Sequence, residues 1–171
     1  HENMALDEAL LDAHEPGPST LRLYAWKPFA LSIGYFQAAG EARPILETLP
    51  DIVLTRRPTG GGAIVHAREA TYALVADAPG EPGASRLLYA RMNQAIARAL
   101  DAFGVSASER GGTRGTQGAA FLCFERHADF DVTVRGRKIA GSAQRRKGQA
   151  LLQHGSILLA TPPLAGEGLT S

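Results

Sequence analysis

The 171-residue sequence has a single cysteine, Cys123, so it lacks the residues for an internal disulfide or a cysteine-based zinc site. It also lacks any apolar run that approaches the ~18 residues of a membrane-spanning helix, and it has no recognisable secretion signal. Its net charge is only +1, whereas proteins that bind nucleic acid generally concentrate basic residues on one surface. We therefore expect a cytoplasmic protein that uses neither a membrane nor nucleic acid.

The composition that is present suits a globular protein, with 44% hydrophobic and 20% charged residues. Residues 1–171 have the length of one domain, and we expect a single catalytic domain. The sequence begins at His1 rather than at a methionine, and it ends in a stretch rich in glycine and proline, 161–171. We expect from this that the native protein extends beyond at least one terminus.

Hydrophobic periodicity predicts three helices and several short strands. The helices are expected over 4–14, 42–49 and 85–103, and the strands over 21–26, 30–36, 52–55, 63–66, 71–76, 105–109, 130–134, 138–144 and 150–160. In the first helix, which Asn3 is expected to cap, the periodicity places Leu6, Leu10 and Leu11 on the buried face and Asp7 elsewhere. The mixture predicts an α+β fold with a mixed, largely antiparallel β-sheet and helices packed against it.

Three consecutive glycines, Gly60–Gly62, follow the sequence Arg56-Arg57-Pro58-Thr59. Glycines allow the backbone to approach a ligand closely, although a flexible hairpin turn has the same sequence. The segment is not a nucleotide P-loop, because no Gly-Lys-Ser/Thr ending is present, and no helix is predicted after it as a dinucleotide fingerprint requires. Because neighbouring strand residues point to opposite faces, at most one of the two arginines can face a pocket.

Lys138 and Cys123 are the candidate reactive residues. Lys138 precedes the Gly141-Ser142 step on a predicted strand, where it is either a solvated surface lysine or a fixed cation that stabilises negative charge on a ligand. Cys123 is either an inert buried thiol or a nucleophile that forms a thioester. A nucleophilic thiol needs a neighbouring cation or base, and Lys138 and three histidines are candidates that the sequence does not rank: His66, His127 and His154.

The spacing of His66 and His154 matches no metal-ligand pattern, so we expect these histidines to support the site through hydrogen bonds or packing, and we expect no metal site.

Several of these segments, in the same order, resemble the lipoate–protein ligase and octanoyltransferase family, which is related to the biotin ligases. Residues 3–8 resemble the first helix of that family, and residues 32–37 resemble its S-x-G-x-x-Q strand end. Residues 56–66 resemble its R-R-x-[ST]-G-G-G/R-A-V-x-H element. Residues 136–144 and 154–156 resemble the strand of the catalytic lysine and the strand beside it. The resemblance covers nearly the whole chain.

This resemblance implies a tunnel for a medium-length acyl chain, lined by the backbone of the glycine motif, with Lys138 at the acyl carbonyl. The product would be an amide on a specific lysine of a lipoyl domain or of the glycine-cleavage H protein. The residues that it implies for substrate binding are Arg56, Arg57, Thr59, Gly60, Gly61, Gly62, His66, Gly141, Ser142, Ala143, His154 and Gly155.

Two branches of the family compete. The transferases take octanoate from acyl carrier protein through a cysteine thioester and need no cofactor, and Cys123-Phe124-Glu125 resembles their Cys-Phe-Asp segment. The ligases activate lipoate with ATP and magnesium through lipoyl-AMP, and Gly60–Gly62 resembles their glycine motif, whose third position is often arginine in the transferases. The acidic residue that the family favours after the motif's histidine is replaced here by Ala67. We favour the transferase branch over the ligase branch. A biotin ligase and a non-catalytic paralogue that binds an acyl carrier are two further candidates.

Overall fold

The computed structural model describes residues 2–78, 80, 83–109, 121–123 and 131–160. Its helical elements are α1 (Glu2–Asp12), the 3-10 helix η1 (Ala39–Ala42), α2 (Arg43–Thr48) and α3 (Ala84–Ala102). Its strands are β1 (Thr20–Tyr24), β2 (Ala30–Ile33), β3 (Val53–Arg56), β4 (Ile64–His66), β5 (Glu69–Asp77), β6 (Ser108–Glu109), β7 (Val132–Val134), β8 (Arg137–Lys147) and β9 (Ala150–Leu158).

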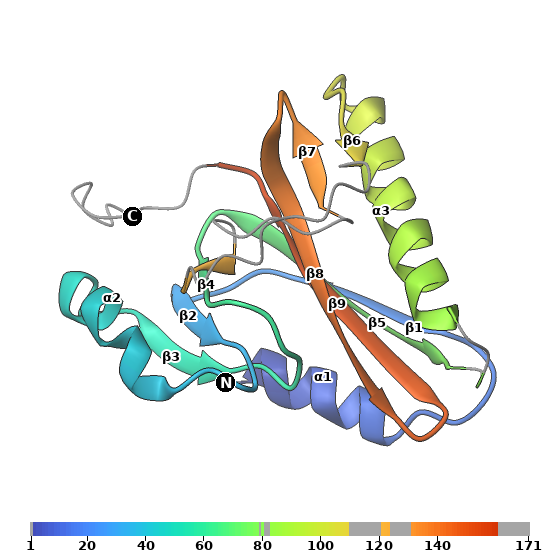
Figure 1. Ribbon diagram of the computed structural model, residues 1–171, viewed down its shortest axis with the longest axis horizontal. Coiled ribbons are helices and arrows are strands. Elements are labelled where there is room, and N and C mark those ends of the chain that lie inside the picture. The colour runs from blue at the N-terminus through green and yellow to red at the C-terminus, as the bar shows by residue number, and fades with distance from the viewer. Residues whose placement is uncertain (1, 79, 81–82, 110–120, 124–130, 161–171) are drawn as a thin grey trace.

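The strands form two sheets (Figure 1). The large sheet has six strands in the order β1-β5-β9-β8-β7-β6, and each neighbouring pair is antiparallel. The small sheet has the order β3-β2-β4, with a parallel β2–β3 pair and an antiparallel β2–β4 pair. The predicted α+β fold with a mixed, largely antiparallel sheet is therefore confirmed.

Each face of the large sheet is covered by a different element. On one face, Ile96 of α3 packs against Tyr72, Val132 and Ala140. On the other face, Leu11 of α1 packs against the sheet residues Ala73, Val75 and Leu152. Complete burial of one such aliphatic side chain contributes roughly 1.5–3 kcal/mol. In Figure 1, α3 and the small sheet lie on opposite sides of β8 and β9, which leaves the face opposite α3 to form a site with the small sheet.

The small sheet has its own apolar core, which includes Leu31, Ile33, Ala63 and Val65. Trp26 packs with Met4 of α1 and Ala30 of β2. The chain from β1 into β2 therefore joins the two sheets, and its packing fixes their relative position.

The expectation for the buried face of the first helix was confirmed for Leu11, against which Leu10 packs, and was wrong for Leu6 and Asp7. Leu6 is 49% exposed, whereas Asp7 is completely buried together with Met4 and Leu11. The physical reason is that Asp7 accepts hydrogen bonds from several buried donors, described below, which no hydrophobicity pattern can reveal. Asn3 does not cap the helix, because the helix begins at Glu2 and the Asn3 side chain bonds to Ala25.

Other element bounds differ from the predictions at their ends. The strand predicted over 30–36 ends at Ile33, because a turn follows in which the Gln37 backbone N–H donates to the carbonyl of Gly34. The strand predicted over 105–109 is limited to Ser108–Glu109. Residue 130 of the strand predicted over 130–134 lies outside the described residues. None of the described helices combines the length and the apolarity that are needed to cross a bilayer.

Candidate active site

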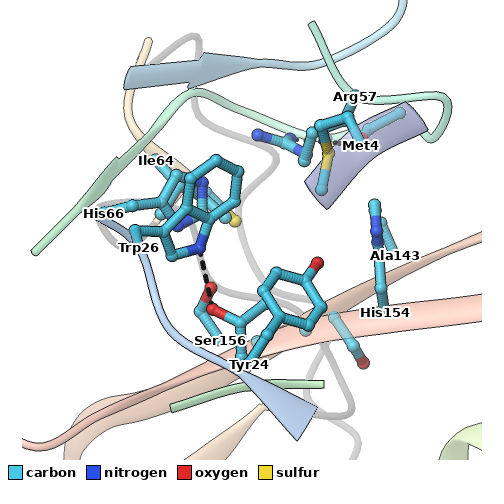
Figure 2. Close-up of a pocket in the computed structure, with 16 residues that line it drawn as sticks. Met4, Tyr24, Trp26, Arg57, Ile64, His66, Ala143, His154 and Ser156 are labelled. Atoms are coloured by element: carbon cyan, nitrogen blue, oxygen red, sulfur yellow. Dashed lines mark hydrogen bonds between the residues drawn. The ribbon is translucent and has the colours of Figure 1, made fainter. Parts of the chain in front are cut away.

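A narrow cavity of about 40 Å³ is lined by residues of both sheets and of α1 (Figure 2). Its lining residues are Met4, Tyr24, Trp26, Arg57, Gly60, Gly61, Ile64, His66, Thr71, Cys123, Gly141, Ser142, Ala143, His154, Gly155 and Ser156. Most of the residues that the sequence suggested for the site are therefore brought together here, although they come from segments far apart in the chain. Thr59, Gly62 and Lys138 do not line the cavity but contact residues that do, and Arg56 points away from it.

The Lys138 ammonium group lies beside Cys123 and is paired with a carboxylate. Its Nζ is 2.9 Å from Oδ1 of Asp131, 3.2 Å from the Cys123 carbonyl oxygen and 3.9 Å from the Cys123 Sγ. The Lys138 and Asp131 side chains are only 4% and 5% exposed, which rules out a solvated surface lysine. A buried ammonium group is strongly stabilised by a paired carboxylate, so the arrangement holds a fixed positive charge beside the only thiol.

The glycine motif holds the cysteine in place through backbone hydrogen bonds. The Cys123 N–H donates to the carbonyl of Ala63 at 2.7 Å, and the Ala63 N–H donates to the carbonyl of Phe121 at 2.8 Å. The side chain of Gln37 also donates to the Phe121 carbonyl, while its Oε1 accepts from the N–H of Gly34. The glutamine of the S-x-G-x-x-Q element thus connects the end of β2 to the segment that carries the thiol.

Two glycines are required by close backbone contacts at this point. A Cβ atom on Gly62 would lie 2.9 Å from both the Cys123 nitrogen and the Phe121 oxygen, and one on Gly34 would lie 2.1 Å from the Gly61 oxygen. Real Cβ atoms do not approach backbone atoms so closely. The glycine motif is therefore packed against the cysteine segment, and it is not a freely flexible hairpin.

Neighbouring arginines on β3 and just after it perform different tasks, and only Arg57 faces the cavity. The buried Arg57 donates to the carbonyl and hydroxyl oxygens of Ser32, and also to the carbonyls of Gly60 and Gly62. Burial lowers the pKa of Arg57 to about 10, so it stays charged at neutral pH. The exposed Arg56 instead donates to backbone carbonyls of the turn at residues 34–37. The predicted opposite orientation is confirmed.

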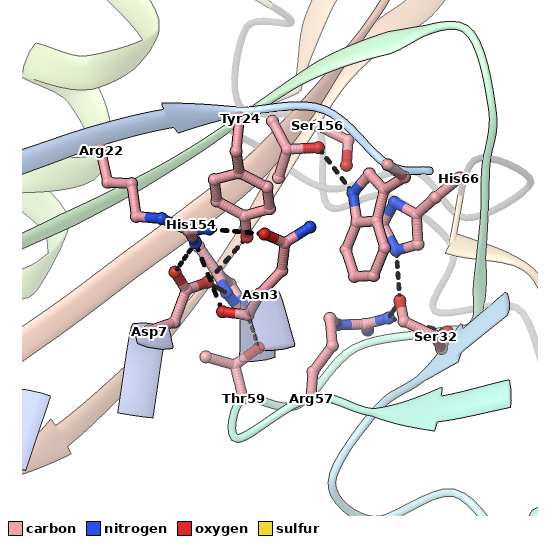
Figure 3. Close-up of polar contacts among 12 residues, drawn as sticks. Asn3, Asp7, Arg22, Tyr24, Ser32, Arg57, Thr59, His66, His154 and Ser156 are labelled. Atoms are coloured by element: carbon pink, nitrogen blue, oxygen red, sulfur yellow. Dashed lines mark hydrogen bonds and ion pairs between the residues drawn. The ribbon is translucent and has the colours of Figure 1, made fainter. Parts of the chain in front are cut away.

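His66 lies in a buried chain of hydrogen bonds that begins at Arg57 (Figure 3). Its Nε2 is 2.6 Å from the Ser32 hydroxyl, and its Nδ1 is 2.5 Å from Oε1 of Glu69. Because the carboxylate can only accept, Nδ1 carries the proton and Nε2 accepts from Ser32. The His66 ring is thus bonded to the carboxylate of Glu69, although Ala67 follows it directly in the sequence.

The same Glu69 oxygen anchors the floor of the cavity. It also accepts from the hydroxyl groups of Thr71 and Ser156, at 2.7 and 2.8 Å. Thr71 in turn accepts from the Trp26 indole N–H at 2.9 Å, and the Trp26 ring stacks on His66 with centroids 4.0 Å apart. Among the described residues, Glu69 Oε2 is buried without a hydrogen-bond partner. The other polar atoms named here are engaged with one another, and the Trp26 ring is an apolar surface toward the cavity.

His154 lies in a second buried chain, which links the glycine motif to α1 (Figure 3). Its Nε2 is 2.6 Å from the Thr59 hydroxyl, and its Nδ1 is 3.1 Å from Asp7. Asp7 also accepts from Tyr24 at 2.7 Å and from Arg22 at 2.8 Å. Burial and the Asp7 carboxylate raise the pKa of Tyr24 above its ordinary value, so its hydroxyl stays a donor.

Both histidines therefore have both ring nitrogens occupied, as the prediction of a supporting hydrogen-bonding role requires. Neither ring has a free nitrogen to accept the proton of Cys123. His127 lies outside the described residues. Of the groups that the sequence suggested as partners of the thiol, the structure places Lys138 within 3.9 Å of it.

Burial lowers the folded-state pKa of His66 and of His154 below the ordinary value of 6.5. The unfolded chain therefore binds protons below about pH 6.5 that the folded protein excludes, so stability falls as the pH falls through that value. From pH 7.5 to 5.5 we therefore expect the free energy of unfolding to fall, with most of the fall below pH 6.5, where the unfolded histidines take up protons. Urea denaturation at the two pH values measures this drop, and equal midpoints would contradict the assignment of both rings as neutral.

The sequence did not single out Asp7, Glu69, Asp131 or Trp26. Asp131 could have been found, because it lies on the predicted strand adjoining that of Lys138, where a carboxylate can reach a lysine across the pair. Asp7 and Glu69 gave no comparable signal, because their partners are distant in the chain. Among the residues that the structure describes, no group of three or more His, Cys, Asp or Glu side chains is arranged to hold a metal ion.

Residues 1–163 match the family model of the lipoyl protein ligase A/B catalytic domain. The chain therefore belongs to this family, and the resemblance seen in the sequence motifs is confirmed. Among curated proteins, it is 42% identical to the octanoyltransferase LipM of Kyrpidia tusciae, over 95% of this chain and 63% of that protein. It is 43% identical to the octanoyltransferase LipM of Moorella thermoacetica, over 93% of this chain and 61% of that protein. The chain thus spans just over three fifths of the length of these relatives.

Solved structures with the same fold are described as lipoate–protein ligases. The putative lipoate protein ligase Ta0514 of Thermoplasma acidophilum with bound lipoic acid superposes with a TM-score of 0.77 and 26% identity, over 93% of this chain and 63% of that chain. Lipoate-protein ligase A bound with ATP superposes with a TM-score of 0.76 and 27% identity, over 92% and 61% of the two chains. These likenesses support the fold, while the more similar curated relatives are transferases.

Proposed function

We propose that this chain is the catalytic domain of an octanoyltransferase. It takes an octanoyl group from acyl carrier protein, holds it as a thioester on Cys123 and passes it to a lysine of a lipoyl domain or of the glycine-cleavage H protein. The observation that carries this proposal is the position of the Cys123 thiol in the wall of the cavity, 3.9 Å from the Lys138 ammonium. The transferase activity assigned to the curated relatives supports it.

Two steps follow from this arrangement. In the first, the Cys123 sulfur attacks the carbonyl carbon of the donor thioester, the bond to the donor sulfur breaks, and the proton given up by the Cys123 thiol ends on the departing donor thiol. In the second, the acceptor lysine amine attacks the enzyme thioester, a C–N bond forms, the bond to Sγ breaks, and the proton lost by the amine ends on the Cys123 sulfur. Each step passes through an oxyanion, and the buried Lys138 ammonium is positioned to stabilise it. A single such donor contributes about 3 kcal/mol to a transition state.

The supporting residues have roles in binding and positioning. Gly60, Gly61, Gly141, Ser142, Ala143 and Gly155 supply backbone and small side chains along the acyl chain. Asp131 holds the Lys138 side chain in place through their ion pair. The glycine motif is held rigid against the cysteine segment by the hydrogen bonds of Arg57, Thr59, His66 and His154. Gly62 lies at the contact between the two segments, and Arg56 donates a hydrogen bond to the adjacent turn. This chemistry needs neither ATP nor a metal.

A second candidate is an ATP-dependent lipoate–protein ligase that acts through lipoyl-AMP with magnesium. It is favoured by the described ligase neighbours, one of which has ATP bound. In that reaction Lys138 would contact the carboxylate and the α-phosphate, and Cys123 would be dispensable. Gly62, the residue that resembles the ligases, has a separate cause here, because its Cβ would collide with the backbone of Cys123.

Intact-protein mass spectrometry after incubation with octanoyl-acyl carrier protein in the absence of ATP tests the proposal. An octanoyl adduct that hydroxylamine removes, and that disappears when an apo-lipoyl domain is added and becomes octanoylated, is the expected result. No adduct, together with lipoyl-domain modification that requires ATP and lipoate, would establish the ligase. Tight binding of the acyl carrier with neither reaction would leave a non-catalytic paralogue, and transfer of biotin would identify a biotin ligase.

A further inference from the structure

Two aromatic side chains extend into solvent from the turn that follows β2. Phe36 is 88% exposed and Tyr35 is 50% exposed, and their rings meet edge to face with centroids 5.1 Å apart. Exposed apolar surface is unfavourable in water, and aromatic residues are enriched in protein–protein interfaces, where they contribute much of the binding energy. The turn is therefore a candidate for a surface that binds another protein.

Hydrogen bonds hold this turn in one conformation. The Tyr35 N–H donates to the carbonyl of Thr59 at 2.8 Å, and Nη1 of Arg56 donates to three carbonyls of the turn. The Arg145 guanidinium lies 5.3 Å from the centre of the Tyr35 ring, within the range of a cation–π contact. The Phe36 ring is thus presented on a preorganised backbone, so a partner does not have to order the turn when it binds.

The turn adjoins the cavity that contains the thiol. A Cβ atom on Gly60 would lie 3.8 Å from the Phe36 ring, and Gly60 lines the cavity. The side chain of Gln37 donates to the carbonyl of Phe121, two residues before Cys123. Cys123 lines the same cavity and is itself partly exposed. A protein bound on Phe36 would therefore lie against the segments that form the cavity wall around the thiol.

The proposed transferase brings two proteins to the thiol, and they differ in reach. The donor carries its acyl group on a long flexible arm, so the carrier protein itself need not contact the cavity wall. The acceptor presents a lysine amine on a short aliphatic stem. The body of the acceptor therefore has to lie against the segments around Cys123, which include the turn that carries Phe36.

Arg56 gives this surface a positive charge that is available to a partner. Its side chain is exposed, and within the part of the chain that the structure describes no carboxylate forms an ion pair with it. The acidic groups beside the turn are already engaged, because Glu8 lies 3.8 Å from Arg145 and Glu41 accepts from the Ala38 N–H. A carboxylate on the acceptor therefore complements Arg56, whereas a basic surface would be repelled.

We propose that Tyr35, Phe36 and Arg56 form the docking surface for the acceptor protein. The acceptor places an apolar side chain on the Phe36 ring and a carboxylate on Arg56, which brings its target lysine to the acyl group on Cys123. The inference rests on the proposed function, which supplies the acceptor.

Phe36→Ala removes the ring at the centre of this surface. We expect KM for an apo-lipoyl domain to rise about tenfold with kcat unchanged, because a central aromatic contact is lost. The formation of the octanoyl adduct from octanoyl-acyl carrier protein and its removal by hydroxylamine should keep their wild-type rates, since neither step involves the acceptor. A merely structural role of the ring would change these two rates as well.

Phe103→Ala is the matched control. Phe103 is 87% exposed, but it follows α3, which lies on the other side of β8 and β9 from the small sheet (Figure 1). Its KM for the apo-lipoyl domain should equal that of the wild type. Phe36→Glu and Phe36→Lys remove the same ring and add opposite charges, so KM should be several times higher for Phe36→Glu. Equal values or the reverse order would contradict an acidic acceptor surface.

Calorimetric binding of the apo-lipoyl domain in the absence of any acyl donor separates this proposal from the proposed function. We expect Kd to rise about tenfold in Phe36→Ala, whether or not the wild type forms an octanoyl adduct, whereas a missing adduct counts against the transferase function alone. Equal Kd and KM values in the wild type and Phe36→Ala would overturn the docking surface. Slower adduct formation in Phe36→Ala would also overturn it, since the carrier protein would then bind there, and so would a wild-type dimer that Phe36→Ala dissociates.

Discussion

Replacement of Cys123 by alanine is expected to abolish the octanoyl adduct and to reduce ATP-independent transfer to a lipoyl domain by about four orders of magnitude or more. The size of the effect follows from the loss of the nucleophile, which in comparable covalent enzymes leaves only the contributions of binding and of the oxyanion site. The backbone of the variant should be preserved, because Cys123 is held by its N–H and carbonyl groups rather than by its side chain alone.

The chain offers a clean readout for this experiment. Since Cys123 is its only cysteine, a hydroxylamine-sensitive adduct on a thiol can form at no other residue. Lys138→Met is the companion variant, because it keeps the thiol and removes the cation beside it. Its rate of adduct formation should fall by about 10²–10³, the usual cost of removing one oxyanion donor. Full ATP-independent transfer by the alanine variant would eliminate the thioester mechanism.

Asp7→Ala is expected to have the largest effect on stability, a loss of about 3–5 kcal/mol in the free energy of unfolding. Asp7 is completely buried and accepts hydrogen bonds from Arg22, Tyr24 and His154. Without the carboxylate, the charge of Arg22 and two further donors lose their partner in a largely dry environment. Because His154 also holds Thr59, the glycine motif should lose part of its support.

Urea denaturation of two further variants shows whether the loss of stability comes from the buried hydrogen bonds of Asp7 or only from the removal of a negative charge. Asp7→Asn keeps one oxygen acceptor and should cost less than Asp7→Ala. Glu47→Ala removes the carboxylate of an exposed ion pair with Arg43, and such pairs contribute only about 0–1 kcal/mol. If Asp7→Ala and Glu47→Ala proved equally mild, the buried network would not be the element that fixes α1 to the sheet.

Much of the architecture follows from the sequence, because the local pattern and the fold agree. The strands β5 and β9 and the helix α3 were predicted close to their observed bounds, since each is rich in apolar residues. The strand β8 was predicted over 138–144 and is longer, from Arg137 to Lys147. The alternation of Arg56 and Arg57 across the strand was also predicted, because it depends only on the strand period. The motifs that resemble the family lie around one cavity, as expected of residues that share a site.

The sequence could not determine which polar groups become buried together. Asp7 was predicted to lie off the buried face of its helix, because hydrophobic periodicity treats a carboxylate as polar. The pattern cannot show that Arg22, Tyr24 and His154 will donate hydrogen bonds to it. Likewise, the sequence did not indicate that Glu69 would be the carboxylate bonded to His66.

By itself, then, the sequence determined the fold class, the family and the presence of one thiol and one lysine in suitable segments. Only the tertiary structure decided that Lys138 is buried against Asp131 and directed at Cys123, and that Gly62 has no room for a side chain. The physical reason is range: periodicity reports the neighbours of a residue along one element, whereas hydrogen bonds and close contacts join atoms from elements that meet only when the sheets pack.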